Sequence, residues 1–194
     1  MGIDQNLIFL EGKCVWLKVL SQSDISESSW VGWFNDAERN RYNTHHYWPN
    51  TYENQQIFLA QSISPSKIQL GIIDKKEPEL ICGVISLQQI NLIDRKAEIA
   101  TMMDRRTRSQ PNIFVESWSL LLKHGFQELG LNKIYGGSIN TRIPKLLCEL
   151  FNFEIEGTLK KHVFKSGEYI DVIQSAVFVD TIKYPILNDN EVTR

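Results

Sequence analysis

The residues between positions 97 and 153 have the types and spacing best suited to chemistry. A strand-like run at 97–103 leads into a polar turn at 104–112 that contains three arginines. The turn leads into a long amphipathic pattern, with apolar residues at helical spacing after Pro111. A strand that enters a helix through a cationic turn brings free backbone N–H groups and positive charge together. This arrangement predicts a binding site for a ligand that bears phosphate.

The elements around this segment predict an α+β fold. Three strand patterns between residues 69 and 103 are separated by short polar breaks and indicate an antiparallel meander. A further strand at 134–139 follows the long helix, so we expect it to run parallel to a neighbour. A hairpin-like pattern at 157–179 completes a mixed, mostly antiparallel central sheet with helices on both faces. We expect one domain over residues 1–180 and a tail over 181–194.

The composition is that of an ordinary globular chain, with 42% hydrophobic and 23% charged residues in a length of 194. The formal net charge of −2 argues against a nucleic-acid partner or an anionic membrane surface, and no apolar run is long enough to span a bilayer. The first residues lack the basic start and apolar stretch of a signal peptide. The three cysteines form no CxxC pair, and the histidines are not spaced with them as ligands. We therefore expect reduced thiols, no metal site and a cytoplasmic location.

Seven segments of the chain, in their order and spacing, resemble the GNAT superfamily of acyl-CoA-dependent N-acyltransferases. The resemblance is strongest to the branch that contains the RimJ and RimL ribosomal-protein acetyltransferases and bacterial amino-sugar acetyltransferases. It implies a GNAT-like fold, acetyl-CoA as co-substrate and transfer of an acetyl group to an amine. The segments are 15–20, 33–38, 81–87, 97–100, 125–134, 151–157 and 167–172.

The resemblance implies that Glu98 is the catalytic base. Alternation along a strand places Glu98 on the face opposite Ala97 and Ile99, and in this family that face lines the cleft near the acyl thioester. An amine is protonated at neutral pH and must lose a proton before it attacks, and a carboxylate can accept that proton directly or through one water. The alternative is a surface glutamate that pairs with Lys96 or Arg95.

The resemblance also implies where acetyl-CoA binds. In this family a bulge at the position of Met102 and Met103 opens the sheet, and backbone groups there hold the pantetheine arm. Asn140, at the end of the next strand, would contact the pantetheine or the leaving thiol. Cys148 lies where some members carry a tyrosine that protonates the thiolate, but a free cysteine is more often buried than catalytic, and water can serve instead.

The loop before the long helix departs from the family pattern, Arg/Gln-x-x-Gly-x-Gly/Ala. Both glycines, which let backbone N–H groups approach phosphate, are absent from its sequence, Ser109-Gln110-Pro111-Asn112-Ile113-Phe114. Two interpretations stay open: the loop holds CoA through fewer amides with help from arginines, or the site is degraded and the domain binds without catalysing. On the first interpretation, the cofactor-binding residues are Met102, Met103, Arg106, Arg108, Ser109, Gln110, Asn112, Ile113 and Asn140.

An aromatic and histidine-rich region before residue 50 is expected to form the acceptor side, because segments at this place wall off the acceptor pocket in the family. Aromatic rings stack on sugars or bases, and His and Asn side chains supply hydrogen bonds. The alternatives are a core position for Trp33 and a polar surface loop for the two histidines. The expected acceptor-binding residues are Trp33, Asn35, His45, His46 and Tyr47.

These observations predict an N-acetyltransferase that acts on the primary amine of a small molecule, with a nucleotide-linked amino sugar as the first candidate. A protein N-terminus is the second acceptor, and a GNAT-fold binding module without catalysis is the alternative from another class. The sequence leaves open whether the chain is a monomer or a homodimer.

Overall fold

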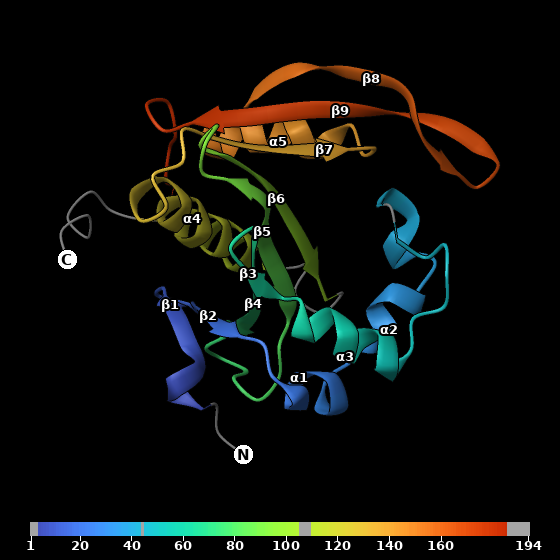
Figure 1. Cartoon of the computed structure of the whole chain (residues 1–194), viewed down its shortest axis with the longest axis vertical. Coiled ribbons are helices and arrows are strands. Elements are labelled where there is room, and N and C mark those ends of the chain that lie inside the picture. The colour runs from blue at the N-terminus through green and yellow to red at the C-terminus, as the bar shows by residue number, and fades with distance from the viewer. Residues whose placement is uncertain (1–3, 44, 105–109, 186–194) are drawn as a thin grey trace.

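The computed structural model describes residues 4–43, 45–104 and 110–185. Within these residues, nine strands form one mixed sheet in the order β1-β2-β4-β5-β6-β7-β9-β8, and β3 pairs with β4 (Figure 1). Neighbouring strands are antiparallel except β6 and β7, which are parallel. The strands are β1 Ile8–Glu11, β2 Val15–Val19, β3 Ile63–Ser64, β4 Lys67–Asp74, β5 Gly83–Asn91, β6 Lys96–Met103, β7 Lys133–Ser138, β8 Glu154–Lys165 and β9 Glu168–Phe178.

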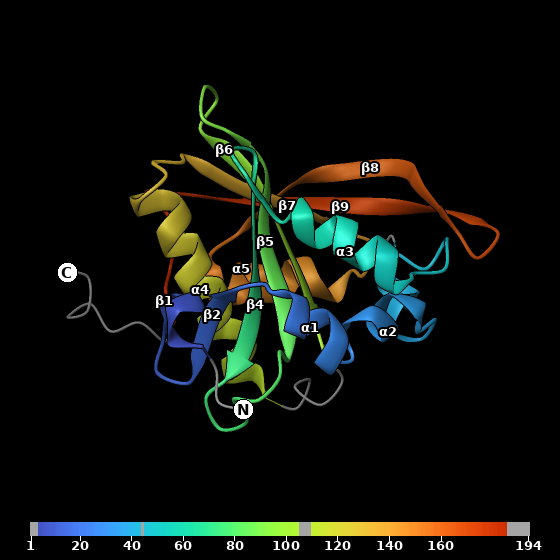
Figure 2. The same ribbon diagram turned by 60° about the horizontal axis from the view of Figure 1, so that its bottom comes forward.

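Helices cover both faces of the sheet (Figures 1 and 2). One core joins the sheet to α4 and α5, and a second core joins the opposite face to α1, α2 and α3. This arrangement confirms the predicted α+β fold. In the described part of the chain, no helix has the length and apolar character needed to cross a membrane. The helices are η1 Gln5–Leu7, α1 Gln22–Glu27, α2 Trp30–Asn35, η2 Arg39–Tyr42, α3 Tyr52–Ala60, α4 Pro111–Gln127 and α5 Arg142–Phe151.

The parallel pairing between β6 and β7 is short. Three residue pairs are in register, and the last joins Glu98 to Tyr135. Beyond this point β6 continues to pair with β5, while β7 continues to pair with β9. The two strands therefore diverge and the sheet forks (Figure 1). A Cβ atom on Gly136 would lie 3.2 Å from the carbonyl oxygen of Ile99, so a side chain there would crowd the strands where they separate.

The bulge expected at Met102 and Met103 was wrongly placed. Both residues pair in regular register with Val84 and Gly83 of β5. The irregularity lies at the other end of this strand pair, between Gln88 and Asn91, where the backbone of Gln89 has a φ of +52°. The sheet thus opens because the pairing of β6 with β7 ends, not because β6 bulges.

A buried carboxylate fixes α4 to the N-terminal strands. Glu116 is fully buried, and its oxygens accept hydrogen bonds from the backbone N–H groups of Lys13, Cys14 and Val15 at 2.7, 2.8 and 3.0 Å. The thiol of Cys14 donates to the same carboxylate at 2.8 Å, and burial with this contact raises the pKa of Cys14 to about 12. A Cβ on Gly12 would lie 2.6 Å from the Glu116 carboxyl carbon, so glycine is needed at this close approach.

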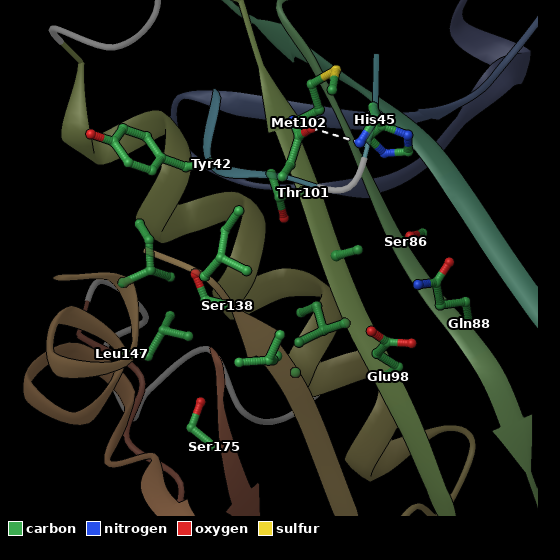
Figure 3. Close-up of a pocket in the computed structure, with 18 of the residues that line it drawn as sticks. Tyr42, His45, Ser86, Gln88, Glu98, Thr101, Met102, Ser138, Leu147 and Ser175 are labelled. Carbon is green, nitrogen blue, oxygen red and sulfur yellow. Dashed lines mark hydrogen bonds between the residues drawn. The ribbon is translucent and has the colours of Figure 1, made fainter. Parts of the chain in front are cut away.

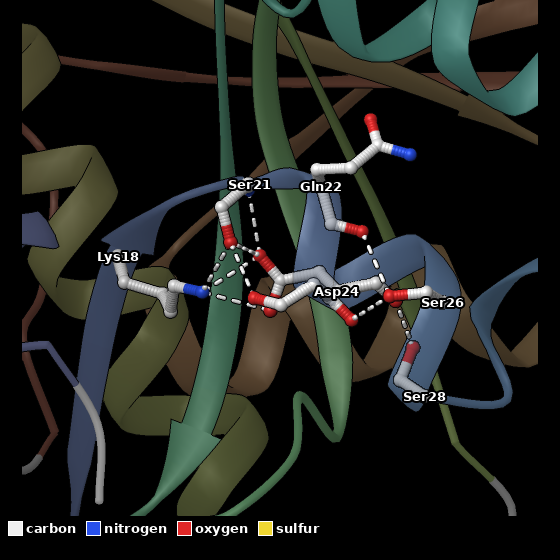
Figure 4. Close-up of polar contacts among 7 residues, drawn as sticks. Lys18, Ser21, Gln22, Asp24, Ser26 and Ser28 are labelled. Atoms are coloured by element: carbon white, nitrogen blue, oxygen red, sulfur yellow. Dashed lines mark hydrogen bonds and ion pairs between the residues drawn. The ribbon is translucent and has the colours of Figure 1, made fainter. Parts of the chain in front are cut away.

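A second buried ionic contact fixes α1 to β2 (Figure 4). The Lys18 ammonium lies 2.6 and 2.7 Å from the two carboxylate oxygens of Asp24, and both residues are buried. Asp24 also accepts from the backbone N–H and the hydroxyl of Ser21, which is the N-cap of α1. These hydrogen bonds give both buried charges a partner. They also fix the first turn of α1, the first helix of the α1–α3 layer, against β2.

The folded domain continues past the predicted boundary at residue 180. The side-chain amide of Asn152 donates to the carbonyl oxygen of Thr181 at 3.0 Å. Ile182 and Tyr184 pack against the main core. The predicted boundary is therefore a few residues early, and positions 186–194 of the predicted tail lie outside the described residues.

We expect Glu116→Ala to lower the free energy of unfolding by about 3 kcal/mol or more, because it leaves three backbone N–H groups without an acceptor. Urea unfolding followed by circular dichroism measures this change. Glu149→Ala is the matched control, since Glu149 is an exposed glutamate of α5, and its effect should stay within about 0.5 kcal/mol. Equal effects of the two substitutions would contradict the anchoring role of Glu116.

Candidate active site

A cavity of about 570 Å³ lies at the fork between β6 and β7. Phe114 and Trp118 of α4 and Leu147 of α5 line it on one face of the sheet. Phe34 of α2 and Phe58 of α3 line it on the other face. Because β6 and β7 have separated here, the cavity passes through the sheet and is open to groups from both layers.

Glu98 lies at the point where the fork begins, and it lines the cavity (Figure 3). The side-chain amide of Gln89 donates to Glu98 Oε2 at 2.8 Å, and the hydroxyl of Tyr135 donates to Gln89 Oε1 at 3.4 Å. Burial raises the pKa of Tyr135, and the negative charge of Glu98 raises it further. Lys96, the predicted alternative partner, instead pairs with Asp94 at 3.0 Å. The Glu98 carboxylate is therefore held by an uncharged neighbour at the cavity wall.

Three buried polar atoms of residues that line the cavity have no hydrogen-bond partner among the described residues. They are Oε1 of Gln69 on β4 and a pair on either side of the fork, Oγ1 of Thr101 on β6 and Nε1 of Trp118 on α4. Thr101 points into the cavity (Figure 3). An indole N–H needs an acceptor, and a hydroxyl can both donate and accept, so the amide groups of a pantetheine arm suit this pair. The cavity wall thus fits the co-substrate that the sequence predicts.

The predicted cofactor-binding residues near α4 have different environments. Gln110 is the N-cap of α4 and accepts from the backbone N–H of Ile113 at 3.1 Å, and Asn112 is exposed on the first turn. The side chain of Ile113 is 2% exposed in the main core, so its predicted contact with cofactor is wrong for the side chain. Arg106, Arg108 and Ser109 lie outside the described residues.

Of the remaining predicted cofactor-binding residues, some line the cavity and others do not. Met102 lines the cavity, whereas Met103 packs against the main core. Asn140 does not line the cavity, and its side-chain oxygen accepts a hydrogen bond from the backbone N–H of Arg142, the first residue of α5, at 3.0 Å. Its neighbour Ser138 lines the cavity instead. Cys148, also on α5, packs against the core.

Two of the predicted acceptor-binding residues have structural roles. Trp33 is 1% exposed in the second core, and its indole N–H donates to Ser29 Oγ at 2.8 Å. Ser29 in turn donates to Asp104 at the end of β6 at 3.2 Å, which connects α2 to that strand. Asn35 uses both ends of its amide to bind the backbone of Asn50, at 2.7 and 2.8 Å. Trp33 is therefore a core residue, as the alternative interpretation of the sequence had it, and neither Trp33 nor Asn35 lines the cavity.

His45, His46 and Tyr47, the other predicted acceptor-binding residues, lie on a loop that is hydrogen-bonded to the tip of the β8–β9 hairpin. The Lys165 ammonium donates to the carbonyl oxygens of Asn43 and His45 at 2.5 and 2.9 Å, and Tyr47 donates to the carbonyl oxygen of Phe164 at 3.0 Å. Of the three, only His45 lines the cavity in the described structure, while Nδ1 of His46 lies 3.2 Å from the carbonyl oxygen of Phe34.

His45 lies beside Met102 at the cavity wall (Figure 3) and makes an edge-to-face contact with Phe34, with ring centroids 4.9 Å apart. Burial lowers the pKa of His45, and the positive charge of Lys165 lowers it further. A lowered pKa favours the neutral imidazole at pH 7, which can donate one hydrogen bond to an acceptor substrate and accept another.

Sequence reasoning missed a set of polar residues on the sheet itself. Gln69 of β4 and Ser86 of β5 are buried and line the cavity, and Gln88 lies beside Glu98 in the next row of the sheet. A polar residue among the apolar residues of a buried strand was the available signal, because such a side chain needs a partner. Gln89 and Tyr135 gave no comparable signal, since the contact that joins them depends on the register of three strands.

The comparisons with known proteins agree with this geometry. The sequence profile of the acetyltransferase (GNAT) domain matches residues 15–140. None of the curated proteins compared with the chain matches it. Among solved structures, spermidine N-acetyltransferase from Vibrio cholerae in complex with CoA and spermine is 20% identical, with a TM-score of 0.75 over 88% of this chain and 98% of that one. The RimL ribosomal L7/L12 alpha-N-protein acetyltransferase in complex with coenzyme A is 18% identical, with a TM-score of 0.76 over 88% and 97%. At these identities the structural likeness establishes the fold.

We expect Thr101→Val to weaken the binding of coenzyme A by roughly five-fold, because about 1 kcal/mol of hydrogen bonding is lost without a change in shape. Isothermal titration calorimetry measures the dissociation constant directly. Thr158→Val on the exposed strand β8 is the matched control and should bind as the wild type does. An unchanged dissociation constant for Thr101→Val would show that this hydroxyl does not contact the co-substrate.

We expect Lys165→Met to raise KM for the amine acceptor several-fold and to leave the dissociation constant of coenzyme A unchanged, because the tether to residues 43 and 45 is lost. The same change should raise the pKa of His45 by removing a nearby positive charge, which NMR titration can follow. Lys160→Met, on the same strand, is the control. An unaltered KM together with an unaltered His45 pKa would argue against this tether.

Proposed function

Because this chain belongs to the GNAT acetyltransferase family, it is an N-acetyltransferase that uses acetyl-CoA, and we propose that its acceptor is the primary amine of a small molecule. A nucleotide-linked amino sugar is the first candidate. The observation that carries the proposal is the position of Glu98, at the start of the fork and on the wall of the cavity.

Glu98 takes up the proton that the amine must lose. When bound, acetyl-CoA supplies the thioester carbonyl carbon that the amine nitrogen attacks. Glu98 Oε2 accepts a hydrogen bond from the Gln89 amide, whereas Oε1 makes no hydrogen bond with a described residue. One carboxylate oxygen is therefore available to receive a proton. The Gln89 amide fixes the orientation of the carboxylate without neutralising it.

The character of the cavity wall supports a small acceptor with one amine. Among the described residues that line the cavity, Glu98 is the only acidic one. A polyamine carries several positive charges, each of which would need a carboxylate or another set of acceptors on burial. Amide, hydroxyl and aromatic side chains dominate the acceptor half instead, including Gln69, Ser86, Phe34 and Phe58. Such a surface suits a polar ring.

A protein N-terminus is the second candidate acceptor, because RimL is among the similar structures. The hydrogen bonds that join Asn43, His45 and Tyr47 to the hairpin tip favour the small molecule, since they hold His45 at the cavity wall. The cytoplasmic location stays a prediction, and the state of association stays open.

A panel of amines tests the acceptor class. Purified enzyme and acetyl-CoA are incubated with amino sugars, nucleotide-linked amino sugars, polyamines and short peptides, and release of free thiol is measured. We expect the highest kcat/KM for a hydroxylated small amine. Turnover confined to peptides or polyamines would overturn the proposed acceptor and leave the acetyltransferase assignment intact.

We expect Glu98→Gln to lower kcat at pH 7 by about 100-fold, because a neutral amide cannot accept the amine proton. The thermal shift produced by acetyl-CoA should stay as in the wild type, because the substitution preserves shape. Glu149→Gln, in the exposed part of α5, is the control and should retain full activity. A Glu98→Gln enzyme with wild-type kcat would remove Glu98 from this role.

A further inference from the structure

We infer that the acceptor carries a hydroxyl group that is bound by Gln69, two strands away from Glu98. This inference rests on the proposed function and specifies the chemistry of its substrate. It starts from the face of the sheet that lies toward α2 and α3, where the register of β4, β5 and β6 brings polar side chains from three strands together.

The register defines two neighbouring rows on this face. In one row Glu98 pairs with Gln88, and in the next row Ala100 pairs with Ser86, which pairs with Gln69. Residues two apart on a strand share a face, so the side chains of both rows are on the same side of the sheet. All five residues of the two rows line the cavity. Figure 3 shows Glu98, Gln88 and Ser86 along one wall. A polar line thus runs from the catalytic carboxylate to Gln69.

Gln69 lies at the far end of this line and lacks a partner. Its side chain is 5% exposed, and Oε1 has no hydrogen bond with any described residue although it is enclosed. Native proteins pair almost all of their buried polar atoms, so an enclosed amide oxygen without a donor indicates that something else supplies one. Gln69 lines the cavity, so rotation of its side chain can bring this enclosed amide to a ligand bound there.

A hydroxyl group satisfies this position better than other groups. The oxygen and nitrogen of a glutamine amide exchange places by a half-turn, so the enclosed atom can be an acceptor or a donor. A hydroxyl pairs with either, because it both donates and accepts. An ammonium group can only donate, and a second positive charge at Gln69 would have no carboxylate among the described cavity residues other than Glu98.

The separation of the two groups sets the size of the acceptor. Two strand spacings of about 4.8 Å and one same-face step of about 7 Å separate the backbones of Gln69 and Glu98. The two backbones are therefore about 12 Å apart, a separation that a short alkylamine cannot bridge and that a sugar ring bridges together with the two long side chains. A molecule that places its amine at Glu98 and a hydroxyl at Gln69 therefore needs a body of ring size between them.

The experiment compares Gln69→Met with the wild type on two amines of similar size, glucosamine and cyclohexylamine. Methionine keeps the length of the side chain and removes the amide. We expect kcat/KM for glucosamine to fall at least ten-fold in Gln69→Met and kcat/KM for cyclohexylamine to stay within two-fold. Gln56→Met, at an exposed position of α3, is the matched control and should change neither value.

Thermal unfolding without ligand supplies a second readout. Removal of an unpartnered amide from an enclosed site should leave the melting temperature of Gln69→Met unchanged or raise it. A lower melting temperature, or failure to fold, would show that Gln69 has a structural partner and would overturn the inference. Equal losses of kcat/KM on both amines, or no loss on either, would also overturn it and leave the proposed function standing. If the wild-type enzyme acetylates no hydroxylated small amine, the proposed acceptor class fails, and the inference fails with it.

Discussion

The short parallel contact between β6 and β7 is the constraint on which the rest of the structure depends. An inner strand normally has hydrogen-bonding partners along both edges, but β6 loses its β7 partner after Glu98 while its pairing with β5 continues to Met103. The backbone beyond Glu98 is therefore exposed to the cavity rather than to another strand. This single interruption opens a passage through the sheet and places the carboxylate at its start.

Buried ionic contacts hold the layers that border this passage. Glu116 fixes α4, which supplies the wall on one face, and the pair of Lys18 and Asp24 fixes α1 on the other. Asp104 accepts a hydrogen bond from Ser29, so α2 is tied to the end of β6 itself. The elements around the cavity are thus positioned by contacts outside it. Among the buried polar atoms without a hydrogen-bond partner in the described structure, those of Thr101, Trp118 and Gln69 belong to residues that line the cavity.

Local patterns in the sequence were enough to predict much of this structure. The alternation of Glu98 with Ala97 and Ile99 placed the carboxylate on the correct face, and Pro111 marked the start of α4. The hairpin-like pattern at 157–179 corresponds to β8 and β9, and the turn between them contains Ser166 and Gly167, both of which have positive φ. A core position was one of two interpretations for Trp33, whereas the role of Asn35 could not be predicted, because it depends on Asn50, fifteen residues further along the chain. The polar line from Glu98 to Gln69 required the register of three strands, which no local pattern encodes.

A crystal structure of the enzyme with coenzyme A tests the central claim most directly. The account predicts that the pantetheine arm lies in the fork between β6 and β7, with its amides bonded to Thr101 Oγ1 and Trp118 Nε1 and its thiol beside Glu98. A complex in which coenzyme A binds elsewhere, with the fork filled by side chains, would contradict it.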